Sequence, residues 1–450
     1  MLLRRLLRTA LPAAAALALV PAQVAAAPAA PPPTGWHTEA IPSPAFAPLG
    51  LSFDAVGRAM LTWQACCSGP APATPGGLPP GPYIGTDARE PAGGWRRVSN
   101  PPIQSSDSRL YLYGNGRAQQ LGSAAFGPPA PGFHVLAADG TAAGGFGPPR
   151  TLDDNGDLSV SAADGAGDAI IAWLHARGRG GLHMRVAERS AGGAFSMPTF
   201  PAAGVPVAVG IDARGERIVA WRAGGAIYAR VRTPGRPWGR PQLAARLPAR
   251  AGEPVVSVAF GRTGTVALAW ETTFSGCETC GTQQVSAGVA VHTHSPWRSF
   301  TLERSNLAPH VGAFEQADIV ALTDTAGRLY ATWNGVARGA PAVKFARVTP
   351  AGAGPSQTLS ASVRAAALDD AVAGPRAAVL VTWSEGEQPG VGSVNASLRR
   401  AGRAFAPPVR LTPPPVHVPP GLAGFQPVTG EPVVVSGAAG GLEATVGPPG

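Results

Sequence analysis

The sequence predicts an all-β chain made of many short strands, and two features of its composition lead to that prediction. Glycine and proline account for 59 and 49 of the 450 residues, and so many helix-breaking residues exclude a helical bundle or a coiled coil. Hydrophobic residues make up 45% of the chain and include ten tryptophans, so the composition is not that of a disordered chain. Short apolar strands separated by glycine-rich and proline-rich turns remain.

The first 27 residues have the features of a secretory signal peptide. Arg4, Arg5 and Arg8 precede an apolar stretch over 10–20, and small residues fill 22–27. The apolar stretch is about half of the ~20 residues that a membrane span needs. We therefore expect cleavage after this segment and a secreted or extracytoplasmic mature chain without a membrane anchor. The adjacent arginines also fit a twin-arginine export signal.

The cysteine content fits an exported protein. Cys66 and Cys67 are adjacent, and Cys277 and Cys280 are separated by two residues. An even number of cysteines in two local pairs predicts disulfide bonds, with the connectivity left open. A redox centre at the second pair is disfavoured because such a motif normally opens a helix, and no helix is expected here.

Six tryptophans recur along the chain at similar intervals, which indicates an internal repeat. They are Trp63, Trp173, Trp221, Trp270, Trp333 and Trp383. Each follows two small, β-branched or aliphatic residues that fit the end of a strand. Packing between neighbouring repeats is the role we expect for these large rings.

A turn signature precedes four of the six tryptophans, with an aspartate nine residues and a glycine six residues before the ring. The pairs are Asp54 and Gly57, Asp164 and Gly167, Asp212 and Gly215, and Asp324 and Gly327. Aspartate can hydrogen-bond to the backbone of its own turn, and glycine can adopt the left-handed conformation that the turn requires. We therefore interpret these aspartates as hairpin formers and not as catalysts.

Two degenerate units complete the repeat. One has its turn at Gly116 with Gly122 in the tryptophan position, and the other has its turn at Gly430 with Ser436 in that position. Each unit continues with a third strand, and most of them add a short fourth segment after a glycine-rich turn. Four strands in about 50 residues is the content of one propeller blade.

The predicted fold is a β-propeller of eight four-stranded blades, or of seven if the Gly116 unit is not a full blade. It forms a single domain over 35–450, after the signal peptide (1–27) and a linker rich in proline and alanine (28–34). The last unit lacks a fourth strand, and residues 35–38 match the fourth strands of other units. The N-terminal strand is therefore expected to complete the last blade and close the ring.

The blade pattern resembles that of secreted bacterial β-propeller repeat proteins, a loose grouping near the sialidase-like propellers. The resemblance rests on the repeated tryptophan and glycine spacing and covers roughly residues 35–446. It does not extend to the sialidase Asp-box, Ser-x-Asp-x-Gly-x-x-Trp, because glycine and tryptophan are six residues apart here. The resemblance implies a fold and leaves the ligand open.

The longest insertions follow Trp63 and Trp270, over 64–82 and 271–284. In an eight-bladed ring these loops would face each other across the channel mouth, and loops on a rigid scaffold commonly carry function. The chain has no Gly-x-Ser-x-Gly, His-Glu-x-x-His or phosphate-loop motif. No catalytic residue is therefore predicted.

The fourth unit is the most basic region of the chain. Arg230, Arg232, Arg236 and Arg240 form a candidate polyanion patch, or else a solvated outer edge that discourages strand pairing. His292 and His294 would share one face of a strand, but the spacing selects no further metal ligands. No metal and no cofactor are therefore predicted.

The leading interpretation is a secreted, non-catalytic propeller that binds a glycan, a protein or a surface polymer through its loop-rich face. The alternative is a carbohydrate-active enzyme of the sialidase-like class, which would need several arginines and an acid beside a nucleophilic tyrosine at the channel mouth. Nucleic acid is not an expected partner, no membrane anchor is expected in the mature chain, and we expect a monomer.

Overall fold

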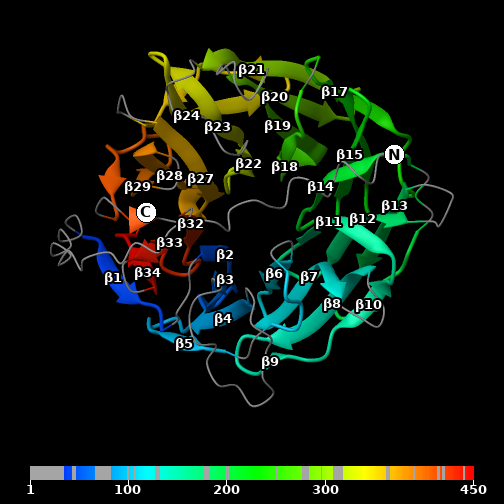
Figure 1. Cartoon of the computed structure of the whole chain (residues 1–450), viewed down its shortest axis with the longest axis horizontal. Helices are drawn as coiled ribbons and strands as arrows, with labels where there is room; N and C mark the ends of the chain where they lie inside the picture. The colour runs from blue at the N-terminus through cyan, green and yellow to red at the C-terminus, as the bar shows by residue number, and fades with distance from the viewer. Residues whose placement is uncertain are drawn as a thin grey trace, which may run out of the picture. The chain divides into compact units, whose positions relative to one another are not determined.

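Eight antiparallel sheets follow one another along the chain in the computed structural model, and each forms one blade of a β-propeller (Figure 1). The prediction of eight blades is confirmed, and the alternative of seven is wrong. The structure describes residues 35–42, 47–65, 83–98, 101–105, 108–126, 132–176, 182–198, 200, 202–249, 251–275, 283–294, 296–307, 318–360, 365–388, 391–412, 416–417, 421–438 and 441–449. The predicted signal peptide, the linker and the four cysteines lie outside these residues.

Blades 1 to 4 are built from the first half of the chain. From the channel outwards, blade 1 consists of β2 (Ala47–Phe53), β3 (Ala59–Ala65), β4 (Tyr83–Arg89) and β5 (Trp95–Arg97). Blade 2 consists of β6 (Arg109–Leu112), β7 (Arg117–Phe126) and β8 (Gly132–Thr141), and both β9 (Gly145–Phe146) and β10 (Arg150–Asp153) pair with β8. Blade 3 consists of β11 (Gly156–Ala163), β12 (Ala169–Ala176) and β13 (Leu182–Arg189), and blade 4 of β14 (Val205–Ile211), β15 (Arg217–Ala223), β16 (Ala226–Arg232) and β17 (Gln242–Arg246). The fourth strand of blade 3 is reduced to a bridge between Glu188 and Ser196.

Blades 5 to 8 repeat the arrangement. Blade 5 consists of β18 (Val255–Phe260), β19 (Thr265–Ser275), β20 (Gln283–Thr293) and β21 (Arg298–Leu307), and blade 8 of β32 (Leu422–Phe425), β33 (Pro432–Ala438), β34 (Gly441–Val446) and β1 (His37–Ala40). Blade 6 consists of β22 (Ile319–Thr323), β23 (Leu329–Ala337) and β24 (Ala340–Thr349), and both β25 (Gly352–Ala353) and β26 (Gln357–Thr358) pair with β24. Blade 7 consists of β27 (Ala365–Ala373), β28 (Val379–Gln388) and β29 (Val391–Arg399), and both β30 (Val409–Arg410) and β31 (Val416–His417) pair with β29. Two short 3-10 helices, η2 (Arg262–Gly264) and η3 (Pro375–Ala377), replace the turn between the first two strands of blades 5 and 7.

The N-terminal strand closes the ring, as the sequence predicts. β1 pairs antiparallel with β34, and His37 lies opposite Val446 while Ala40 lies opposite Glu443. Blade 8 thus combines three strands from the C-terminal end of the chain with one from the N-terminal end. β1 is the outermost strand of this blade, and without it the backbone edge of β34 would be unpaired.

The aspartate and glycine pairs lie in the turns between the first two strands of their blades. In blade 1 Asp54 Oδ1 accepts the N–H groups of Val56 at 3.1 Å and Arg58 at 2.9 Å, and Gly57 has a φ of +91°. Asp164, Asp212 and Asp324 accept backbone N–H groups of their own turns in the same way. We call the end of the propeller that carries these turns the turn end, and the opposite end the loop end.

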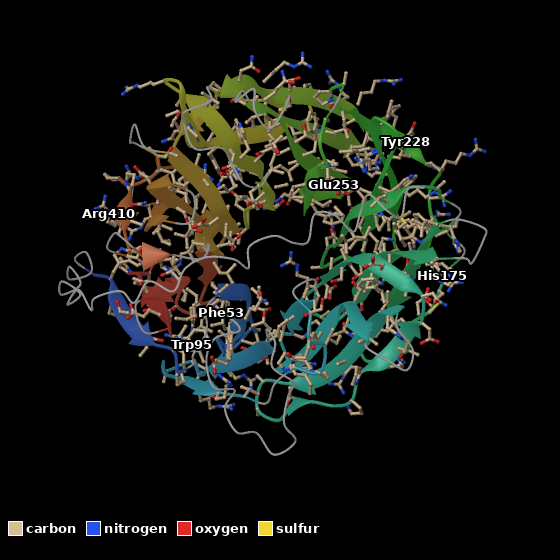
Figure 2. The ribbon with its side chains drawn as sticks, viewed as in Figure 1. Phe53, Trp95, His175, Tyr228, Glu253 and Arg410 are labelled. Carbon is tan, nitrogen blue, oxygen red and sulfur yellow. The ribbon has the colours of Figure 1, made fainter. Side chains whose placement is uncertain are left out.

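The six repeat tryptophans are buried, and each packs against the preceding blade. Trp63 of blade 1 contacts β33 and β34 of blade 8, Trp173 contacts blade 2 and Trp333 contacts blade 5. Trp221, Trp270 and Trp383 pack on blades 3, 4 and 6. Figure 2 shows the side chains around the ring, with Phe53 nearer the channel and Trp95 nearer the rim.

The fourth strands depart in detail from the sequence pattern. In blade 4 the residues around Trp238 (237–239) have the sequence pattern expected of a fourth strand, whereas the fourth strand is β17, which begins at Gln242. Pro237 and Pro241 flank this segment, and proline has no N–H to donate to a neighbouring strand. The aromatic residue therefore precedes the fourth strand and does not belong to it. Among the described residues, no helix is long and apolar enough to cross a membrane.

Candidate functional site

Pockets open at the turn end of the propeller where neighbouring blades meet. One of about 410 Å³ lies between blades 3 and 4, one of about 440 Å³ between blades 4 and 5, and one of about 330 Å³ between blades 7 and 8. A groove of about 570 Å³ runs along the channel wall of blades 3 to 5. The pocket between blades 3 and 4 is the most strongly charged, and we call it the charged pocket.

The charged pocket begins with two arginines that face each other on one hairpin. Arg217 opens β15 and Arg232 ends β16, and the two residues are direct cross-strand partners. Like charges directly opposite each other on a sheet are unfavourable. The pair therefore requires an acid from a neighbouring element.

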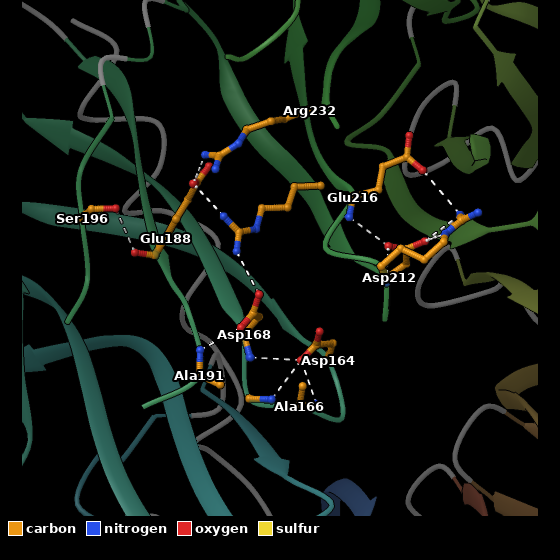
Figure 3. Close-up of polar contacts among 12 residues, drawn as sticks. Asp164, Ala166, Asp168, Glu188, Ala191, Ser196, Asp212, Glu216 and Arg232 are labelled. Atoms are coloured by element: carbon orange, nitrogen blue, oxygen red, sulfur yellow. Dashed lines mark hydrogen bonds and ion pairs between the residues drawn. The ribbon is translucent and has the colours of Figure 1, made fainter. Parts of the chain in front are cut away.

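Blade 3 supplies that acid. Glu188, the penultimate residue of β13, is 3% exposed, and its Oε2 accepts a hydrogen bond from Arg217 Nη1 at 2.9 Å. The same oxygen accepts a second hydrogen bond from Arg232 Nη1. One carboxylate oxygen thus joins two guanidinium groups across the interface between blades (Figure 3).

Three polar atoms of this pocket have unused hydrogen-bonding capacity. Among the described residues, Glu188 Oε1, Arg189 Nε and Arg217 Nε have no hydrogen-bond partner. All three residues are at least 94% buried and all three line the pocket. Buried polar groups in native proteins are almost always paired, so these three atoms need a further partner, which an ordered water or a bound polar molecule can supply.

A second layer of contacts holds these groups in place. Arg217 Nη2 donates to Asp168 Oδ2 at 3.3 Å, and Asp168 Oδ1 accepts the N–H of Ala191 at 2.7 Å (Figure 3). Arg189 Nη1 donates to Asp139 Oδ1 of blade 2 at 2.6 Å. The guanidinium groups of Arg217 and Arg189 are therefore held in place by carboxylates of blades 3 and 2.

The remaining walls come from the turn that follows β13. Ser190, Ser196 and Met197 line the pocket, and Met197 is 51% exposed at its mouth. Ser196 exchanges two backbone hydrogen bonds of 2.8 Å with Glu188, so this wall is tied to the floor of the pocket. Carboxylate, guanidinium and hydroxyl groups within one small volume suit a ligand that both donates and accepts hydrogen bonds.

The arginines of the predicted polyanion patch divide between two environments. Arg232 belongs to the charged pocket, and Arg230, two residues earlier, lies with its guanidinium carbon 4.8 Å from the centre of the Phe200 ring. Burial lowers the pKa of Arg230. Arg236 and Arg240 are exposed on the segment between β16 and β17.

A carboxylate cluster lies on the loop-end side of blades 5 to 8. It consists of Glu271, Asp318, Asp369 and Asp370, which influence one another electrostatically. Burial, together with the charge of Asp370, raises the pKa of Asp318 to about 7. Burial also raises the pKa of Asp369 to about 7 and that of Asp370 to about 6.

The cluster also joins neighbouring blades through the backbone. Asn334 of blade 6 donates its N–H to Glu271 Oε2 at 3.0 Å. Gly421 of blade 8 donates its N–H to Asp369 Oδ2 at 2.9 Å, and Ala423 donates to Asp370 Oδ2 at 3.0 Å. Several of the hydrogen bonds that these acids accept therefore serve to join the blades.

The other sequence candidates lie apart from these clusters. The insertions expected to carry a ligand lie mostly outside the described residues, as do the cysteines, so the predicted disulfides stay a prediction. His292 and His294 line the pocket between blades 4 and 5. Within the described part of the chain, no group of three or more His, Cys, Asp or Glu side chains is arranged to hold a metal ion.

Glu188, Arg189 and Arg217 are not among the site residues predicted from the sequence. Their pocket depends on which blade lies beside which, and on the register that sets Arg217 opposite Arg232. A signal was present, because an arginine at the start of the second strand and another at the end of the third must face each other in a hairpin. Two arginines that face each other in this way predict an acidic residue on the adjacent blade.

The fold defines this protein as an eight-bladed β-propeller with polar pockets between its blades. It matches none of the protein-family models, and no curated protein is significantly similar to it in sequence. Among solved structures it resembles the BP39L lectin from Burkholderia pseudomallei, with 11% identity, 81% of this chain and 99% of the lectin covered and a TM-score of 0.50. Weaker likenesses include YCF48 bound to a D1 peptide (13% identity, 92% and 97% covered, TM-score 0.39) and AofleA from Arthrobotrys oligospora (9%, 73% and 91%, 0.38). At these identities the likeness concerns the fold alone.

Proposed function

We propose that the protein is a secreted, non-catalytic propeller that binds a glycan, and that the charged pocket between blades 3 and 4 receives one sugar unit. The observation that carries the proposal is the set of unpartnered atoms, Glu188 Oε1, Arg189 Nε and Arg217 Nε, in one pocket of about 410 Å³. Sugar hydroxyl groups both donate and accept hydrogen bonds, so one ring can satisfy a carboxylate and two guanidinium groups together.

The surroundings of the pocket favour an acidic glycan. Arg232 leads directly into the exposed segment that carries Arg236 and Arg240. A chain with carboxylate or sulfate groups would gain charge-assisted hydrogen bonds there beyond those made in the pocket. The lectin among the similar folds is compatible with this proposal, although it contributes only the precedent of a propeller that binds sugar.

An array of immobilised neutral and acidic glycans tests the proposal. We expect the chain to bind at least one acidic glycan, and Glu188→Gln and Arg232→Lys to weaken that binding at least tenfold. Arg246→Lys, on the last residue of β17 and outside the charged pocket, is the matched control. Thermal melting of each variant establishes that it is folded. Equal binding by wild type and both pocket variants, or no binding to any glycan, overturns the proposal.

The carboxylate cluster favours a second candidate, a glycoside hydrolase. Glycosidases need a carboxyl group that stays protonated near neutral pH, and the raised pKa values of Asp318 and Asp369 meet that need. Release of reducing ends from a bound glycan, abolished in Asp318→Asn, would establish this activity. A glycan that is bound and stays intact leaves the non-catalytic proposal standing.

A further inference from the structure

The pocket between blades 4 and 5 differs from the charged pocket in the chemistry of its walls. Its lining residues among those that the structure describes are Gln242, Leu243, His292, His294, Pro296 and Trp297, and none of these six is an acid, an arginine or a lysine. Its volume of about 440 Å³ is close to that of the charged pocket. Blade 4 thus has one pocket on each side, one charged and one aromatic.

An aromatic wall dominates this second pocket. The rings of Trp297 and His292 stack with centroids 5.2 Å apart and planes inclined by 28°. Trp297 is half-buried, and its Nε1 is buried without a hydrogen-bond partner among the described residues. The wall therefore offers an aromatic face to the pocket.

The equivalent tryptophan of blade 4 is differently placed. Trp238 precedes β17 as Trp297 precedes β21, but its ring packs edge to face on Phe200 with centroids 5.2 Å apart. Trp238 also packs against the apolar cluster between blades 3 and 4. Trp297 likewise packs against the apolar cluster between blades 4 and 5, but it also lines one of the pockets described above, which Trp238 does not.

We propose that the pocket between blades 4 and 5 is a second saccharide subsite, specific for an uncharged sugar unit. The apolar face of the sugar ring would pack on Trp297, and the Gln242 amide would hydrogen-bond to its hydroxyl groups. This inference rests on the proposed function, because it assigns a second unit of the same glycan.

The register of blade 4 brings the two pockets within reach of one ligand. Gln242 pairs with Ala229, three residues before Arg232 on the adjacent strand. At about 3.3 Å per residue and about 4.8 Å between strands, the nearest strand positions of the two pockets are roughly 11 Å apart. A single oligosaccharide that crosses the outer edge of blade 4 can therefore occupy both pockets.

Fluorine NMR of the full chain labelled with 5-fluorotryptophan tests the subsite. The resonances of Trp297 and Trp238 are assigned with Trp297→Phe and Trp238→Phe. Glucose, galactose, mannose, fucose, N-acetylglucosamine, glucuronate and galacturonate, each as mono- and disaccharide, are then titrated, with calorimetry in parallel. We expect an uncharged saccharide to shift the Trp297 resonance saturably while the Trp238 resonance stays in place. The same shift should persist in Glu188→Gln.

The outcomes separate this inference from the proposed function. Calorimetric binding that leaves the Trp297 resonance unmoved overturns the second subsite, and if Glu188→Gln abolishes that binding, the charged pocket stands as the binding site. A Trp297 shift that is lost in Glu188→Gln also overturns an independent subsite. The absence of binding by every saccharide in both measurements overturns both proposals.

Discussion

Two groups of carboxylates join neighbouring blades, and they do so by opposite means. Between blades 3 and 4, Glu188 faces two guanidinium groups that approach within hydrogen-bonding distance. In the carboxylate cluster of blades 5 to 8, Asp369 and Asp370 face backbone N–H groups and other acids. The negative charge of Glu188 stabilises the first arrangement, whereas ionisation of the acids destabilises the second. The same side-chain group therefore gives interfaces that should respond differently to mutation and to pH.

Removing the acid from the charged pocket should have the largest effect. Glu188→Ala leaves Arg217, which is 6% exposed, and Arg232 opposite each other without their shared partner. We expect the free energy of unfolding to fall by about 3–5 kcal/mol, the usual cost of breaking a buried ion pair. Urea denaturation at pH 7 measures the change.

A surface pair provides the control for that measurement. Glu90 and Arg96 form an ion pair of 3.3 Å with side chains 48% and 43% exposed. Glu90→Ala should cost less than about 1 kcal/mol because exposed pairs are screened by water. If both variants lose the same small amount, the ion pairs of the charged pocket do not stabilise the fold.

Removing an acid from the carboxylate cluster should stabilise the protein. Burial raises the pKa of Asp318 from 3.8 to about 7, so the folded state binds a proton that the unfolded state has lost between about pH 4 and pH 7. The contribution of Asp318 to stability is therefore lost as pH rises through this window. Asp318→Asn should raise the free energy of unfolding by about 1–3 kcal/mol at pH 8, and by less at pH 5.

Urea denaturation at the two pH values distinguishes this effect from a general gain in stability. Asp154→Asn, on a carboxylate that is 76% exposed, is the matched control and should change stability little at either pH. A gain from Asp318→Asn that does not depend on pH would show that ionisation of Asp318 is not the cause.

The smallest effect is expected for a carboxylate that stays within one hairpin. Asp164 Oδ1 accepts the N–H groups of Ala166, Gly167 and Asp168 at 2.9–3.0 Å. Asp164→Ala should cost about 1 kcal/mol, because the turn is partly exposed and water replaces the lost acceptor. Thermal melting measures the loss, and Asp164→Asn, which keeps an acceptor oxygen, should lose less. A loss as large as that of Glu188→Ala would erase the distinction between turn and interface carboxylates.

The number of blades could be predicted because each blade contains a recognisable pattern of residues that are close together in the sequence. A hairpin turn is specified by residues such as Asp54 and Gly57, which are neighbours in the chain and need no knowledge of distant contacts. Closure by residues near 37 could be predicted for the same reason, since the count of strands left one place empty. These are properties of the repeat and not of any particular interface.

The charged pocket could not be predicted in the same way. Glu188 and Arg232 are 44 residues apart and come from different blades, so only the packing of the blades brings them together. The candidate polyanion patch of the fourth unit stays a prediction. In the structure Arg232 is paired in a pocket while Arg236 is exposed, and the sequence does not reveal this division. The raised pKa values of Asp369 and Asp370 likewise depend on burial, which the sequence does not reveal.

The pairing of β1 with β34 has a kinetic consequence. His37 and Val446 are partners although more than 400 residues separate them, so this contact has nearly the largest sequence separation that the chain allows. Blade 8 cannot be completed until its three C-terminal strands exist, and until then the growing chain exposes an unpaired edge of β1. Folding of the ring should therefore end with its slowest step. In a circular permutant whose termini lie between two other blades, the ring-closing step would occur at those blades, and the native contacts would stay the same.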